Sequence, residues 1–333
     1  MPKYSIILPV RNGGEYVKEC VHSILAQTLQ DFTLQVLDNC STDGTLQWLE
    51  SLHDSRIELH PSTKPLTIEE NWARITAINK NEFITLIGHD DVLDKDYLSV
   101  VDKLVNSNPE ATLFLTHFRY INANGGTIRR CKPMADKLSA SQFLAFFLTN
   151  LIDSMGTGFM MRSKDYDSVG GIPLYPNLLF ADFELWISLI RKGSLVVDFA
   201  ECFSFRLHQS MTTSSSTLKF KDAFTRFLDF LLQLKQDPTH KEVIERYAIN
   251  FITFYTKGLS HRLLRTSLKE RNGLTVTKFV EECKTYADKI LPSNNFDPYA
   301  DYSMKLARQI DSNAVGRYSF LMFKKIYSKP LYQ

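Results

Sequence analysis

Two adjacent aspartates, Asp90 and Asp91, follow an apolar run in the segment "FITLIGHDDVL" (residues 83–93). The apolar, β-branched residues predict a buried strand over residues 82–88, and a turn leaving such a strand needs only one carboxylate. Hard cations such as Mg²⁺ and Mn²⁺ prefer carboxylate oxygens, so binding a ligand is one use that a second carboxylate could have. The alternatives are a solvated turn without a ligand and a phosphohydrolase-type His-Asp site, although the latter needs further His and Asp residues on helices.

Two other groups of polar residues follow predicted strands in the first hundred residues. The pattern predicts strands over 4–10, 32–39, 56–61 and 82–88, and helices over 14–27 and 68–79 and after a cap at Ser41 or Thr42. Strands separated by helices of about ten residues indicate a mostly parallel sheet. Because such sheets bind ligands at the carboxyl ends of their strands, residues 9–12, 38–39 and 88–91 should converge on one edge.

A second group of strands and then a helical region follow. The pattern predicts strands over 111–122, 156–163, 194–199 and 202–208, and a helix over 182–193 that ends on a glycine. The polar tract at 210–217 is typical of a loop, and beyond it the pattern is helical. We therefore predict an α/β domain over residues 1–215 and a helical region over residues 216–333.

Composition narrows the class of protein. The chain has 333 residues and a formal net charge of +2, without the basic excess typical of a nucleic-acid-binding protein. Its five cysteines are scattered without a CxxC pair, which indicates a reducing compartment and neither a zinc site nor a disulfide framework. No apolar run reaches the ~18 residues that a membrane span needs, and the N-terminus lacks signal-peptide features. We expect a cytoplasmic protein.

Four separated segments carry a resemblance to a known family. They are "SIILPVRNGGEYVKECVHSILAQTLQDFTLQVLDNCSTDGT", "NEFITLIGHDDVL", "FADFELWISLIRKG" and "FRLHQSMT". In this order and at these spacings they resemble the inverting GT-A glycosyltransferases of family 2, which build bacterial capsules, O-antigens and other surface glycans. The resemblance covers residues 3 to about 212 and implies a GT-A fold with a Rossmann-like, mostly parallel sheet.

The resemblance implies a nucleotide-sugar site at the predicted sheet edge. Asp38 would accept a hydrogen bond from N3–H of uracil or thymine, which implies a UDP- or dTDP-sugar donor, and Arg206 would meet phosphate charge. Asp43 suits a turn cap as well as a ligand contact, and capping of the next helix is the alternative for Asp38. The predicted donor-binding residues are Pro9, Val10, Arg11, Asn12, Asp38, Asn39, Asn71, His89, Asp90 and Arg206.

The resemblance also implies that a divalent cation, Mn²⁺ or Mg²⁺, binds the donor diphosphate. The family motif Asp-x-Asp reads Gly88-His89-Asp90 here, so its first aspartate is missing and Asp91 is an additional one. Either Asp90 or Asp91 is the expected ligand, because a shift of one residue at a strand end changes which carboxylate faces the cleft. His208 would complete the metal site.

Asp182 aligns with the catalytic aspartate of the family at the start of a predicted helix. The resemblance implies that its carboxylate removes the proton from the acceptor hydroxyl as that oxygen attacks the anomeric carbon. The preceding residue, usually glutamate, is Ala181 here, which bears on acceptor contacts. A plain helix N-cap is the alternative for Asp182, and Glu184 should point away from it.

The last segment, "VGRYSFLMFKKIYSKPLYQ" (residues 315–333), mixes aromatic and aliphatic residues with four basic residues and no acidic one. The basic residues are Arg317, Lys324, Lys325 and Lys329. Such a segment suits the interface of an anionic membrane, where a lipid-linked acceptor would lie. A helix docked on the α/β domain or on a second subunit is the alternative.

Together these features predict an inverting, metal-dependent glycosyltransferase that extends a bacterial surface glycan, with a glycan or a lipid-linked glycan as acceptor. Contact with the inner face of the plasma membrane is part of this prediction. The missing motif aspartate and Ala181 leave open a catalytically inactive GT-A module that binds nucleotide or glycan or scaffolds other transferases. A nucleotidyltransferase would need a glycine-rich loop bearing Arg or Lys after the first strand, and "PVRNGGEY" is too short and too lightly charged.

Overall fold

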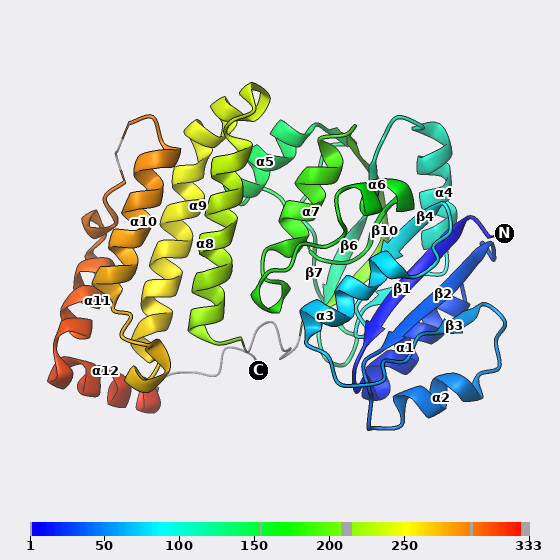
Figure 1. Cartoon of the computed structure of the whole chain (residues 1–333), viewed down its shortest axis with the longest axis horizontal. Helices are drawn as coiled ribbons and strands as arrows, with labels where there is room; N and C mark the ends of the chain where they lie inside the picture. Colours follow the sequence, from blue (N-terminus) through cyan, green and yellow to red (C-terminus); the bar gives the residue numbers. More distant parts are fainter. Residues whose placement is uncertain (1, 154, 208–214, 294–295, 328–333) are drawn as a thin grey trace. The chain divides into compact units, whose positions relative to one another are not determined.

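The computed structural model describes residues 2–153, 155–207, 215–293 and 296–327, and it divides into two compact units. The first unit comprises residues up to 147 together with 151–214, and the second comprises residues 148–150 and those from 215 onward. Figure 1 shows the strands gathered in the first unit and long helices in the second. All of the predicted site residues belong to the first unit, although His208 lies outside the described residues.

A mixed sheet forms the centre of the first unit. Its strands are β1 Tyr4–Val10, β2 Phe32–Asp38, β3 Ile57–Leu59, β4 Phe83–Leu86, β5 Val92–Leu93, β6 Leu113–Ile121, β7 Thr127–Arg130, β8 Lys137–Leu138, β9 Phe159–Arg162 and β10 Leu195–Arg206. Their order is β3-β2-β1-β4-β9-β6-β10-β5, and β7 and β8 pair with β6 and β10. The predicted parallel arrangement holds for β1 to β4 and for β6 with β10, whereas β9 runs antiparallel between β4 and β6. The predicted α/β class is confirmed.

The register of the parallel strands brings the predicted polar groups to one edge. All seven residues of β1 are buried, and Val10 pairs with Asp38 where β1 and β2 end. On its other side β1 pairs with β4, Ile7 opposite Leu86, so residues 88–91 leave the sheet at the same edge. This edge, formed by the carboxyl ends of parallel strands, is where α/β sheets bind ligands.

Seven helices and two 3₁₀ turns are described between these strands. They are α1 Gly14–Leu25, α2 Thr45–Ser51, α3 Ile68–Ala73, η1 Arg74–Ala77, α4 Tyr97–Ser107, α5 Ala140–Leu148, α6 Ser163–Ser168, η2 Pro176–Leu178 and α7 Ala181–Ile190. The predicted cap at Ser41 or Thr42 was wrong, because α2 begins after Gly44, whose φ of +90° suits glycine. The strands predicted at 194–199 and 202–208 form the single strand β10, with an irregularity between Asp198 and Glu201.

The second unit is helical, as predicted. It contains α8 Thr217–Leu234, α9 Pro238–Arg265, η3 Leu268–Arg271, α10 Val276–Ile290, η4 Pro298–Ala300, α11 Tyr302–Ser312 and α12 Ala314–Tyr327. Phe224 of α8 packs against Phe251 of α9 and Phe279 of α10, so these three helices share an aromatic core. Among the helices described, none is both long enough and apolar enough to cross a bilayer.

Candidate active site

Hydrogen bonds join the two loops that follow β1 and β2. The Asn12 N–H donates to Ser41 Oγ at 2.9 Å, and the Thr42 N–H donates to Asn12 Oδ1 at 2.8 Å. Asn12 has a φ of +53°, a region in which asparagine is enriched. The carboxylate of Asp43 accepts from the Gly14 N–H at 2.9 Å, so this side chain stabilises the paired loops.

Asp38 ends β2 with an unused hydrogen-bond acceptor. Its Oδ2 accepts from the Ser41 N–H at 3.1 Å, whereas its Oδ1 is buried without a hydrogen-bond partner among the described residues. Leaving a buried acceptor unsatisfied costs about 1–3 kcal/mol, and an N–H of a bound base would satisfy it. Asp38 does not cap α2, which begins only at Thr45. At the end of the neighbouring strand β1, Pro9 and Val10 are buried, and Arg11, which follows the strand, is exposed.

The side-chain amides of Asn39 and Asn71 are occupied by the protein. Asn39 donates to the Leu66 carbonyl at 2.9 Å and accepts from the Leu66 N–H at 2.7 Å. Asn71 donates to the Leu37 carbonyl at 3.2 Å and accepts from the Arg74 guanidinium at 2.9 Å. Both asparagines are buried, so these hydrogen bonds hold the loops around β2 in place.

The two adjacent aspartates have different surroundings. Asp91 is 2% exposed, and its carboxylate accepts from the Thr157 hydroxyl at 2.8 Å and from the Arg206 N–H at 3.0 Å. Burial, and then the charge of the neighbouring Asp90, raise the pKa of Asp91 well above its usual range. Asp90 and His89 are partly exposed. Of the pair, Asp90 is therefore the carboxylate that a ligand can approach.

Gly88 occupies the place of the first aspartate in the family motif. A Cβ atom there would lie 2.7 Å from Asp90 Oδ1 and 3.0 Å from Asp91 Oδ2. Because Asp91 is held by two donors, it cannot withdraw without losing a hydrogen bond. The packing of this turn therefore disfavours any side chain at position 88. The absence of the first motif aspartate thus agrees with the positions of the Asp90 and Asp91 carboxylates.

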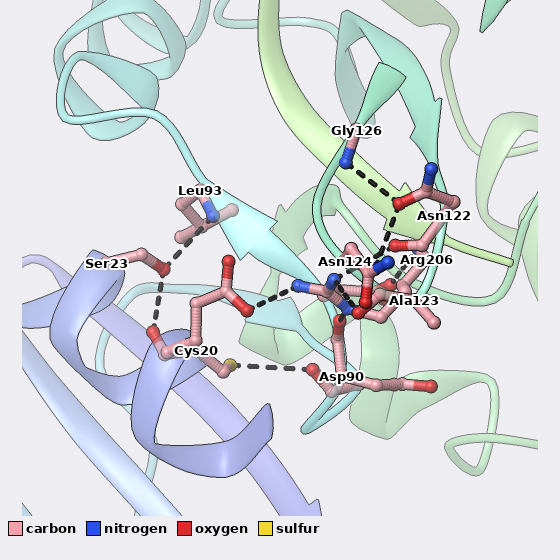
Figure 2. Close-up of polar contacts among 12 residues, drawn as sticks. Cys20, Ser23, Asp90, Leu93, Asn122, Ala123, Asn124, Gly126 and Arg206 are labelled. Atoms are coloured by element: carbon pink, nitrogen blue, oxygen red, sulfur yellow. Dashed lines mark hydrogen bonds and ion pairs between the residues drawn. The ribbon is translucent and has the colours of Figure 1, made fainter. Parts of the chain in front are cut away.

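Arg206 is buried behind the turn that carries Asp90 (Figure 2). Its Nε donates to the Asp90 carbonyl at 2.7 Å, and one terminal nitrogen donates to Glu19 at 2.6 Å. The other terminal nitrogen donates to the carbonyls of Asn122 and Ala123 at 3.1 and 3.2 Å. Since the side chain is 3% exposed, its described contacts favour a supporting role over the predicted contact with phosphate.

Asp182 lies in the first turn of α7 and is not the N-cap, which is Phe180 with a φ of +68°. Burial raises the pKa of Asp182 to about 7, against the opposing effect of backbone hydrogen bonds at the helix start. A carboxylate with a pKa near the working pH suits general-base catalysis. Glu184 instead accepts a hydrogen bond from the Tyr175 hydroxyl.

Two residues that were not predicted from the sequence, Gly156 and Thr157, contact the surroundings of Asp182 and Asp91. Thr157 donates to Asp91, and a Cβ atom on Gly156 would lie 3.7 Å from Asp182 Oδ2. The run of small residues "GTG" at 156–158 was the available signal, but it falls within the strand predicted over 156–163, which in the structure begins at Phe159.

Comparison with known proteins decides the family. Residues 5–170 match the family model described as glycosyl transferase family 2. The chain carries a family 2 glycosyltransferase domain. It is 28% identical, over 67% of its length and 84% of the relative's, to TuaG of Bacillus subtilis (strain 168), named as a teichuronic acid biosynthesis glycosyltransferase.

Two further proteins resemble this family 2 glycosyltransferase. The Escherichia coli protein WfgD, named as a UDP-Glc:α-D-GlcNAc-diphosphoundecaprenol β-1,3-glucosyltransferase, is 24% identical over 76% of this chain and 93% of its own. The crystal structure of Staphylococcus aureus TarS 1–349 with UDP-GlcNAc matches with a TM-score of 0.66 at 15% identity, covering 99% of this chain and 93% of that one. The predicted GT-A fold followed by a helical region is thus confirmed.

A divalent cation would need several suitable ligands close together. Within the described ranges no three His, Cys, Asp or Glu side chains cluster so as to hold a metal ion. His208, the predicted third ligand, lies outside the described residues. Mg²⁺ and similar ions often bind through one or two carboxylates together with substrate phosphates. The partly exposed Asp90 therefore fits a cation that arrives with a nucleoside diphosphate.

Proposed function

We propose that this family 2 enzyme is an inverting glycosyltransferase that moves a sugar from a UDP- or dTDP-sugar to a hydroxyl group of a glycan or lipid-linked glycan. The proposal places the reaction in the synthesis of a bacterial surface polysaccharide. Its main support is Asp182, a carboxylate whose pKa of about 7 fits a base at neutral pH. The names of TuaG and WfgD and the UDP-GlcNAc bound to TarS point in the same direction.

In this proposal Asp38 selects the base of the donor. Its buried Oδ1 lacks a donor among the described residues, and the N3–H of uracil or thymine would supply one. The hydrogen bonds between Asn12, Ser41 and Thr42 fix the loops that would enclose the nucleoside. Binding would thus remove the cost of an unsatisfied acceptor, which favours nucleotides that carry an imide N–H.

Asp90 would bind the divalent cation, which would neutralise the charge of the departing diphosphate. Hydrogen bonds from other parts of the chain hold the turn that carries Asp90. Arg206 holds the Asp90 carbonyl, and Asp91 is held by Thr157 and by the Arg206 N–H. Asp91, the other predicted metal ligand, has its carboxylate engaged by these two donors, so we assign the metal contact to Asp90.

Asp182 would act on the acceptor. Its carboxylate takes the hydroxyl proton while the hydroxyl oxygen forms a bond to the anomeric carbon. The bond between that carbon and the diphosphate breaks, and its electron pair leaves with the nucleoside diphosphate. Because attack comes from the face opposite the leaving group, the anomeric configuration is inverted. A positioned base of this kind contributes about 10²–10⁴-fold to the rate.

The test is release of nucleoside diphosphate from UDP-, dTDP- and GDP-sugars, with and without Mn²⁺, in the presence of GlcNAc-diphosphoundecaprenol and of oligosaccharide acceptors. We expect Mn²⁺-dependent release from a UDP- or dTDP-sugar by the wild type and its loss in Asp182→Asn. Release from GDP-sugars alone, or an Asp182→Asn variant with wild-type activity, would contradict the proposal. A protein that binds nucleotide without turnover would be the inactive module.

We further propose that α12 rests on an anionic membrane surface. Six apolar side chains of this helix are between 38% and 74% exposed: Val315, Tyr318, Leu321, Met322, Phe323 and Ile326. Lys324 and Lys325 lie in its last turn, and the helix has no acidic residue, which suits an interface with anionic lipid. Arg317, in contrast, is buried and donates to the Thr266 carbonyl at 2.8 Å, so it fastens α12 to its own unit.

Vesicle flotation tests this membrane contact. We expect the protein to float with phosphatidylglycerol vesicles, to float less with phosphatidylcholine vesicles, and to lose binding in Val315→Ser/Ile326→Ser. Arg265→Gln, which removes a basic residue outside α12, is the control for charge alone. Concentration-dependent dimerisation without vesicle binding would instead assign the exposed face to a second subunit.

A further inference from the structure

A short segment, Met155–Gly158, is fixed tightly to the elements around it. The Trp186 indole N–H donates to the Met155 carbonyl at 3.0 Å, which ties the segment to α7. At its other end the Gly158 N–H donates to the Leu86 carbonyl at 2.9 Å, and the Tyr97 hydroxyl donates to the Gly158 carbonyl at 3.1 Å. The segment therefore has a defined position between α7 and the end of β4.

The middle of this segment is held by Asp91. The buried Thr157 hydroxyl donates to Asp91 Oδ2 at 2.8 Å, and Asp91 Oδ1 accepts from the Arg206 N–H at 3.0 Å. Asp91 thus links the turn that carries Asp90 to the Met155–Gly158 segment. The two carboxylates after β4 therefore differ: Asp90 is partly exposed, and Asp91 positions a neighbouring segment.

Gly156 lies against the carboxyl group of Asp182. A Cβ atom on Gly156 would lie 3.7 Å from both Cβ and Oδ2 of Asp182 and 3.9 Å from its Cγ, which is ordinary van der Waals contact. The φ of Gly156 is not in the left-handed region, in contrast to Gly158 with a φ of +80°. An alanine would therefore fit at position 156, and neither the backbone nor the packing requires glycine there.

We infer that Gly156 determines which acceptors reach Asp182, because glycine places no side chain beside that carboxyl group. The hydrogen bond from Thr157 to Asp91 keeps Gly156 in this position. A methyl group at position 156 would occupy the space beside Oδ2, where a hydroxyl on a bulky sugar ring must approach. The inference rests on the proposed role of Asp182 as the base. It adds one specificity-determining residue, Gly156, and one positioning residue, Thr157.

Access to Asp182 is measured without knowing the acceptor. The protein is treated with a water-soluble carbodiimide and glycine ethyl ester, and modification of Asp182 is followed by mass spectrometry. Glu15, whose side chain is 85% exposed, is the internal reference. We expect Asp182 to be modified in the wild type and about tenfold more slowly in Gly156→Ala, the effect of a small steric barrier. Modification of Glu15 should not change.

The positioning role of Thr157 is tested by a double substitution. Thr157→Val keeps the shape but removes the hydroxyl, so Gly156→Ala/Thr157→Val should recover modification of Asp182. Gly156→Ala/Thr157→Ser keeps a hydroxyl and should stay slow. Melting temperatures and UDP affinity measured on each variant identify any loss of folding.

Two results would overturn the inference: a wild-type Asp182 that is not modified, or a Gly156→Ala variant modified at the wild-type rate. Equal rates in the two double variants would remove the role of Thr157. These outcomes are separate from a failure of the proposed function, which would appear as full transferase activity in Asp182→Asn. Slow modification of Asp182 in Gly156→Ala, together with full activity in Asp182→Asn, would show that position 156 controls access to a carboxylate that is not the base.

Discussion

Asp91 and Asp182 are both carboxylic acids whose pKa is raised by burial, but the protein surrounds them differently. Asp91 accepts hydrogen bonds from Thr157 and from the Arg206 N–H. For Asp182 the hydrogen bonds that favour the charged form come from the backbone at the start of its own helix. The partners of Asp91 thus come from distant parts of the chain, whereas the hydrogen bonds at Asp182 come from its own helix. Strongly perturbed pKa values cluster at functional sites.

The largest expected effect concerns activity. Asp182→Asn should lower kcat by about 10²–10⁴-fold, because the base is lost while the shape of the side chain is kept. The dissociation constant for UDP should not change, since Asp182 is assigned to the acceptor. The measurement is UDP release under saturating donor together with calorimetric titration of UDP. A variant in which both quantities change equally would place Asp182 in the donor site.

The second prediction concerns the pH dependence of stability. The folded pKa of Asp182, about 7, lies above the value of 3.8 for an ordinary aspartate. Between these values the folded state binds more protons than the unfolded state, so this group lowers stability as pH rises from about 4 to 7, by at most about 4 kcal/mol. Asp182→Asn should therefore gain stability relative to the wild type as pH rises. Urea unfolding of both proteins at pH 5 and pH 8 gives the difference in their free energies of unfolding. A difference between Asp182→Asn and the wild type that does not grow with pH would contradict the raised pKa.

The third prediction separates the two adjacent aspartates. Asp91→Ala leaves the Thr157 hydroxyl and the Arg206 N–H buried without an acceptor, so the free energy of unfolding should fall by about 3 kcal/mol. Asp90→Ala, the matched control at a partly exposed position, should change it by less than about 1 kcal/mol. Chemical unfolding compares the two variants, and equal losses would show that Asp90 is as structural as Asp91.

The smallest expected effect is at Gly88. Gly88→Ala should cost about 1–2 kcal/mol, because the new Cβ atom would meet the carboxylates of Asp90 and Asp91 at 2.7 and 3.0 Å and one of them must shift. Gly170→Ala, where the added Cβ atom meets no neighbour but the φ is +84°, is a control for backbone strain alone. A Gly88→Ala variant as stable as the wild type would show that the turn adapts, and would leave the missing aspartate unexplained.

The sequence predicted those parts of the structure that depend on local pattern. Strands β1, β2 and β4 have buried runs of apolar residues, and their parallel order followed from the helices between them. The antiparallel direction of β9 was not predicted, because pairing direction depends on strands far away in the chain. The helices α4, α5 and α6 were not predicted either. The cap of α2 was misplaced because Gly44, with a left-handed φ, ends the loop where a serine or threonine was expected.

For the site, residue type alone did not separate ligand-binding from supporting residues. Arg206 was expected to bind phosphate, but its partners Glu19 and Asn122 lie 187 and 84 residues away in the sequence, and no local pattern reveals such contacts. The partner of Asp91, Thr157, is 66 residues away. A charge at a strand end therefore marks a candidate site, and contacts with residues far away in the sequence decide which of these charges the protein buries.

The most direct test of this division of roles is calorimetric titration of UDP, with and without Mn²⁺, on the wild type, Asp90→Asn and Asp182→Asn. We expect Mn²⁺ to strengthen UDP binding by the wild type and by Asp182→Asn, and we expect Asp90→Asn to lose this effect. The opposite pattern, with Mn²⁺ acting on Asp90→Asn but not on Asp182→Asn, would contradict it, as would a wild-type protein that does not bind UDP.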